Sequence, residues 1–69
     1  MIALLEFSPR GIPAVTIYAS EHHLQVARGK PDGIVMRSRV DFEKQLRLHG
    51  KNDWAKRVLE GIDVEAFSG

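Results

Sequence analysis

Basic side chains concentrate in the second half of the sequence, where they could bind phosphates or carboxylates. Residues 37–57 hold seven bases against three acids, a net charge of +4, whereas residues 58–69 hold three acids and no base. Such a basic stretch attracts nucleic acid or an acidic protein surface. The candidate partner-binding residues, for either kind of target, are Arg28, Arg37, Arg39, Lys44, Arg47, Lys51, Lys56 and Arg57.

A glycine separates two stretches of helical pattern in RLHGKNDWAKRV, residues 47–58, as in a helix-turn-helix motif. That motif usually has a small residue at the position of Leu46, and apolar residues at the positions of Lys51 and Lys56, so all three packing positions mismatch. We therefore favour two amphipathic helices with charged outer faces. A nucleic-acid-binding regulator that uses residues 37–57 remains the alternative.

Three arginines predict a second basic feature, on the sheet. Arg37 and Arg39 would share one face of a strand, because side chains alternate along a strand. With Arg28 across a predicted hairpin, they would form a basic stripe. The simpler interpretation, which we favour, is the polar outer face of a half-buried sheet.

Catalytic and metal-binding patterns are poorly represented. The chain has no cysteine, and its serines lie in turns, at a cap or in the tail, outside any nucleophile motif. His22 and His23 are adjacent, so on a strand they would face opposite ways; we expect them in a turn. His49 fits the last turn of a helix. We therefore expect no enzyme, no cofactor and no metal site.

Two aromatic residues are candidates for an interface. Tyr18 would lie on the strand face opposite Val15 and Ile17. Trp54 would lie at the start of a helix, where it could anchor the core or bind a partner. We favour the core for Trp54.

The first half of the chain has the pattern of strands. Residues 2–7 are mostly apolar, and residues 14–19 are rich in β-branched and aromatic side chains. The GKPDG segment, residues 29–33, has the composition of a tight turn. It predicts a hairpin between residues 23–28 and 34–38. The sheet would have three to four antiparallel strands.

The second half has the pattern of two short amphipathic helices, at about 39–49 and 53–61. Ser38 or Asp41 would begin the first helix, and Asn52 or Asp53 the second. Both helices would pack on one face of the sheet, giving an α+β fold. Residues 1–69 would form one domain, with 63–69 as a tail in which Phe67 could dock and the rest could fray.

The size and composition set the class of function that we expect. A chain of 69 residues buries a small core and leaves strand edges exposed, which favours a homodimer. No apolar run is long enough to span a membrane, and the absence of cysteine favours the cytoplasm. We expect a small non-enzymatic protein-binding accessory module, inhibitory or regulatory, with a protein partner.

Overall fold

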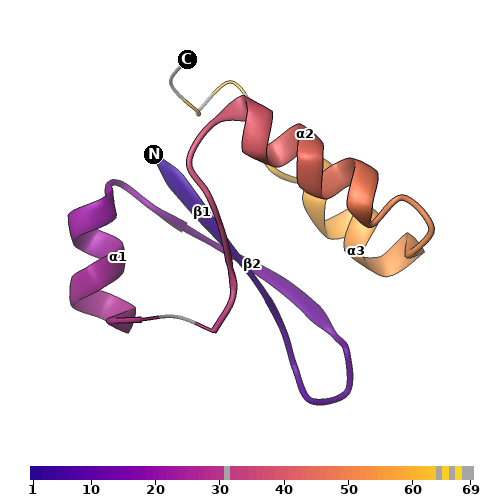
Figure 1. The fold of residues 1–69 in the computed structure, drawn as a ribbon, viewed down its shortest axis with the longest axis horizontal. Helices are drawn as coiled ribbons and strands as arrows, with labels where there is room; N and C mark the ends of the chain where they lie inside the picture. The colour runs from indigo at the N-terminus through magenta and orange to yellow at the C-terminus, as the bar shows by residue number, and fades with distance from the viewer. Residues whose placement is uncertain (31, 64, 66, 68–69) are drawn as a thin grey trace.

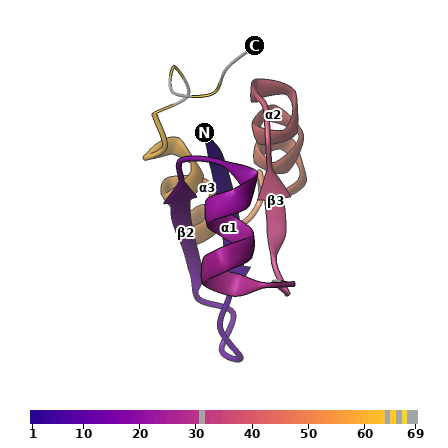
Figure 2. The same ribbon diagram turned by 90° about the vertical axis from the view of Figure 1, so that its left-hand side faces the viewer.

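The computed structural model describes residues 1–30, 32–63, 65 and 67, and has an α+β fold, as predicted (Figure 1). In these residues the elements are β1 (Ile2–Phe7), β2 (Pro13–Tyr18), α1 (Glu21–Arg28), β3 (Ile34–Met36), α2 (Arg39–Leu48) and α3 (Asp53–Glu60). The strands form one antiparallel sheet in the order β2-β1-β3. Helix α1 covers one face, and α2 and α3 cover the other (Figures 1 and 2).

The central strand β1 is buried on both faces, which explains its apolar sequence. Ala3 and Leu5 face α2 and α3, where they pack with a cluster of buried residues from other elements. Those residues are Met36, Phe42, Leu59 and Phe67. Ile2 and Leu4 face the opposite way and pack with Leu24 of α1.

Residues 21–28 form the helix α1, so the predicted strand at 23–28 is wrong. Ser20 caps the helix, its Oγ accepting a hydrogen bond from the His23 N–H at 3.3 Å. Only Leu24 of α1 is buried, while Val26 is 75% exposed. The apolar–polar–apolar order of residues 24–26 resembled strand alternation, but a single anchoring leucine is enough to dock a helix of two turns.

The predicted hairpin at 29–33 is also wrong, because these residues connect α1 to β3. Gly29 ends α1 with φ of 63°, a conformation that favours glycine. Pro31, on which the turn prediction relied, lies outside the described residues. Both β2 and β3 pair with β1 and run parallel to each other, so α1 is a crossover between them.

Gly33 passes closely beneath the central strand. A Cβ at this position would lie 2.6 Å from the Leu5 carbonyl oxygen and 2.8 Å from Leu4 Cδ1. The close approach of the backbone to β1 therefore requires glycine at position 33, whatever the conformation of the preceding turn.

The two C-terminal helices agree with their predicted limits to within one residue. Ser38 begins α2, its Oγ accepting from the Asp41 N–H, and Asp41 Oδ2 accepts from the Arg37 N–H at 2.9 Å. Asn52 begins α3, its Oδ1 accepting from the Ala55 N–H at 3.1 Å. Helix starts were predictable because capping uses residues close in sequence.

Phe67 of the predicted tail is docked on the core, as expected for this residue. Phe67 is buried, and its ring lies 6.3 Å from that of Phe42, between centroids. Residues 64, 66, 68 and 69 of the predicted tail lie outside the described residues.

Candidate functional site

The three arginines of the predicted sheet stripe do not lie on one strand face, so that prediction is wrong. Arg28 belongs to α1, Arg37 follows β3, and Arg39 begins α2. The guanidinium of Arg28 pairs with the Glu6 carboxylate, and its Nε donates to Tyr18 Oη at 3.0 Å. These two contacts raise the pKa of Arg28, the tyrosine hydrogen bond first, and fasten α1 to the sheet.

Arg37 forms a bidentate pair with Glu21 of α1. Its Nη2 donates to Glu21 Oε1 at 2.8 Å, and its Nε donates to Oε2 at 3.0 Å. These hydrogen bonds lower the pKa of Glu21 and raise that of Arg37. The pair joins the start of α1 to the end of β3.

The Glu21–Arg37 pair predicts a pH dependence of stability. Because the pKa of Glu21 is lower in the folded state, its contribution is present above the ordinary carboxyl pKa and is lost as pH falls through the lowered value. Replacing Glu21 with glutamine should therefore lower the Tm slightly at neutral pH and have little effect in acid. Thermal unfolding of both proteins between about pH 2 and 7 checks this.

A double-mutant cycle provides the control for this prediction. If the pair acts as a unit, the double variant Glu21→Gln, Arg37→Gln should lower the Tm no more than either change alone. Fully additive losses at neutral pH would show that the two side chains are not coupled.

Arg39 and Lys56 also have acidic partners. Arg39 lies 3.5 Å from Glu65, and Lys56 lies 4.0 Å from Glu60 on the next turn of α3. Both pairs are exposed, so each ion pair is weak, and Arg39 or Lys56 could exchange its carboxylate for another anion.

The remaining four candidate bases are exposed and make no ion pair within the described part of the chain. Lys44 and Arg47 lie one turn apart on α2, and Lys51 follows in the turn after the helix. Arg57 lies on α3. The structure therefore divides the eight predicted bases into four that form internal pairs, a basic row of Lys44, Arg47 and Lys51 along α2 and the turn after it, and Arg57 on α3.

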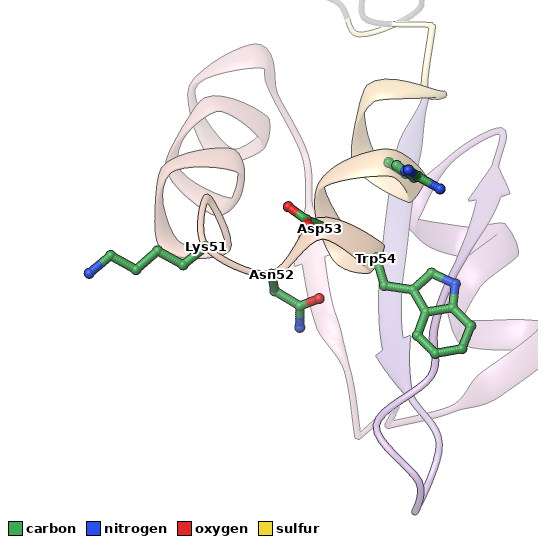
Figure 3. A pocket seen from close by; sticks show the side chains of 5 residues that line it. Lys51, Asn52, Asp53 and Trp54 are labelled. Atoms are coloured by element: carbon green, nitrogen blue, oxygen red, sulfur yellow. The ribbon is translucent and has the colours of Figure 1, made fainter.

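Trp54 is 60% exposed, so the prediction that it anchors the core is wrong. The core face of α3 is occupied by Ala55 and Leu59, both fully buried. Trp54 lies about 100° round the helix from Ala55, which turns its indole to the surface. In Figure 3 the side chains of Trp54 and Lys51 point in opposite directions.

An open groove of about 670 Å³ surrounds the start of α3. Its lining residues are Lys51, Asn52, Asp53, Trp54 and Arg57 (Figure 3). The groove combines one large aromatic surface with charges of both signs, which suits recognition of a polypeptide surface.

A second groove, of about 350 Å³, lies between α3 and the edge strand β2. Its lining residues are Met1, Val15, Ile17, Arg57, Val58, Gly61, Ile62 and Asp63. Arg57 lines both grooves. The sequence pattern did not indicate this groove. Ile17 alternates in step with Val15 and was expected to face the core, yet its side chain is 43% exposed.

Tyr18 and the histidines have structural positions. Tyr18 packs beside the Ile2, Leu4 and Leu24 cluster and accepts the Arg28 hydrogen bond. His49 is partly buried at the end of α2, as predicted, with its ring 5.4 Å from that of Phe7. The prediction of a turn at His22 and His23 is wrong, because both belong to α1.

Two further absences apply to the part of the chain that the structure describes. It contains no group of three or more side chains able to hold a metal ion. None of its helices has the length and apolar character needed to cross a membrane.

A scan against protein-family models, a search of curated proteins and a search of solved structures each gave no match. Function is therefore inferred from the surface alone.

Proposed function

We propose that the chain is a non-enzymatic protein-binding module, accessory or inhibitory, whose partner docks on the groove at the start of α3. The observation that carries the proposal is the exposed indole of Trp54 beside Arg57. Tryptophan and arginine are the residue types most enriched among those that dominate binding energy at protein interfaces.

The charge around this groove favours an acidic partner surface. Lys51 lines the groove, and Arg47 and Lys44 continue the basic row along α2. These side chains are exposed and make no ion pair within residues 1–30, 32–63, 65 and 67. An acidic rim on the partner would therefore gain attraction without breaking an existing pair.

A catalytic role is not part of the proposal. The groups with shifted pKa values are Glu21, Arg28 and Arg37. The shifts of Glu21 and Arg37 come from their mutual pair, and that of Arg28 comes first from its hydrogen bond to Tyr18 and then from Glu6. These contacts join secondary-structure elements, and structural contacts of this kind also shift pKa values without a role in proton transfer. We further propose a cytoplasmic homodimer, supported by the lack of cysteine and by the free edge of β2.

The protein-binding proposal predicts loss of the partner when the indole is removed. Wild-type protein immobilised on beads should retain a specific partner from native lysate, and Trp54→Ala should reduce retention at least about tenfold, as expected for a dominant interface residue. Arg57→Ala should weaken retention as well. Quantitative mass spectrometry of the retained proteins measures both effects.

The matched control is Leu48→Ala. Leu48 is 65% exposed and lies near the joint, but it does not line the groove. This variant should retain the partner, and circular dichroism should show all three variants folded. Equal retention by Trp54→Ala and wild type would remove the groove from the proposal.

Nucleic-acid binding through residues 37–57 is the second candidate, favoured by the basic row of Lys44, Arg47 and Lys51. Binding to duplex and single-stranded oligonucleotides should then fall steeply as salt rises, because each phosphate contact releases counterions. Charge reversal at Arg47 should reduce the slope. No detectable binding at about 50 mM salt would exclude this candidate.

A further inference from the structure

The outer edge of β2 is available for pairing. Strand β2 lies at one end of the sheet order, next to β1, and no described element pairs with its other side. Its six residues carry no charge, and charged side chains are the usual protection of an exposed edge. Helix α3 lies behind β2 in Figure 2, on one face of the strand.

The hydrogen-bonding pattern identifies the groups on this edge. The Ser8 N–H donates to the Ile12 carbonyl at 2.9 Å, at the end of the β1–β2 ladder. Because bonded pairs alternate along an antiparallel ladder, Thr16 directs its N–H and C=O toward β1. Val15 and Ile17 then direct theirs outward, whereas Pro13 has no N–H to offer.

These groups define one register for a second copy. If Thr16 lies opposite Thr16 of the other chain, then Val15 of each chain lies opposite Ile17 of the other. Every outward N–H of Val15 and Ile17 then meets a carbonyl oxygen. Their side chains share the α3 face of the sheet, so the exposed Ile17 of each chain is covered beside the second groove.

Charge along the groove is complementary to itself under the same two-fold rotation. Val15 and Ile17, either side of Thr16, line the groove together with α3. Arg57 and Asp63 also line it, three residues to each side of Glu60. A two-fold axis near Thr16 reverses the direction of α3, so the basic end of each groove meets the acidic end of the other.

We propose that two copies of the chain form a two-fold dimer by antiparallel pairing of β2 with β2, with Arg57 of each chain against Asp63 of the other. This inference deepens the proposed homodimer by naming its interface. It also gives each of the two charged residues that line the second groove, Arg57 and Asp63, a partner of opposite charge. The result is one continuous six-stranded sheet, made from two three-stranded sheets.

Complementary charge reversals test this pairing. Arg57→Glu places two like-charge contacts at the interface, and so does Asp63→Lys. Each variant alone should dimerise at least about tenfold more weakly than wild type. An equimolar mixture should recover the wild-type affinity, because a heterodimer restores both attractive pairs. Sedimentation equilibrium at about 50 mM salt, where charges are weakly screened, measures the four dissociation constants of wild type, of each variant and of the mixture.

A strand-edge variant provides an independent measurement. Ile17→Lys places a charge on the pairing edge and should abolish the dimer. Val26→Lys introduces the same residue on the exposed side of α1 and should leave the dimer intact. Circular dichroism shows whether each variant is folded.

The outcomes separate this interface from the homodimer itself. A monomeric mass for wild-type protein at about 500 μM, well above the micromolar range of standard interfaces, would overturn both. A dimer whose affinity is the same in Arg57→Glu, in Asp63→Lys and in their mixture, or that survives Ile17→Lys, would overturn only the β2 interface. Partner retention through Trp54 is measured separately and depends on neither result.

Discussion

Replacing Leu24 with alanine should lower the free energy of unfolding by about 2–5 kcal/mol, the usual cost of truncating a buried leucine. Leu24 is the only buried residue of α1, and it seals Ile2 and Leu4 on their face of the sheet. A domain this small has a total stability of only about 5 kcal/mol or slightly more. The variant should therefore keep only about 0–3 kcal/mol of stability. Its unfolding midpoint should shift to low urea concentration, which urea titration followed by circular dichroism measures.

The control is Val26→Ala on the same helix. Val26 is 75% exposed, so this change should alter stability by no more than about 0.5 kcal/mol. Hydrogen exchange adds a local measurement: Leu24→Ala should increase exchange in α1 and in β1. If Leu24→Ala and Val26→Ala were equally stable, α1 would not be docked through Leu24.

Replacing Gly33 with alanine should destabilise the protein by about 1–3 kcal/mol, as overpacking of a core does. The new Cβ would lie 2.6 Å from the Leu5 carbonyl oxygen, well inside contact distance. That oxygen belongs to the central strand and cannot move without disturbing its pairing with β2 and β3. Thermal unfolding should show a lower Tm, and hydrogen exchange should be faster at residues 34–36.

Gly61→Ala is the matched control for this substitution. Gly61 has φ of −77°, and the nearest atom to an added Cβ is the Val58 carbonyl oxygen at 3.4 Å. Alanine fits there and restricts the unfolded chain, so stability should stay equal or rise by about 0.4–1 kcal/mol. If Gly33→Ala behaved like Gly61→Ala, the close approach to β1 would not constrain the sequence.

Arg57 links the two proposed interactions, because it lines both grooves. In a dimer its guanidinium would face Asp63 of the other copy, while Trp54 would remain at the outer end of α3. A partner bound at Trp54 would therefore lie next to the dimer interface. A charge change at Arg57 should affect both interactions, whereas Trp54→Ala should affect only the partner.

Local sequence was sufficient for the α+β class, the apolar β1 and the two C-terminal helices. Ser38 and Asn52 accept hydrogen bonds from backbone N–H groups three residues ahead. The start of each helix is therefore determined by residues within one helical turn of each other in the sequence. Ala55 and Leu59 have the spacing of a helical face, and both are fully buried. These features depend on neighbours in the chain and were predictable for that reason.

Tertiary structure decided the second face of the sheet and the character of the surface. Residues 21–28 carry one buried leucine, too little periodicity to distinguish a helix from a strand, and the uncovered side of β1 selected the helix. Arg28 and Arg37 reach Glu6 and Glu21, which are 22 and 16 residues away in sequence. Trp54 is exposed because Ala55 and Leu59 already fill the core beneath α3. Each of these outcomes depends on residues that only the folded chain brings together.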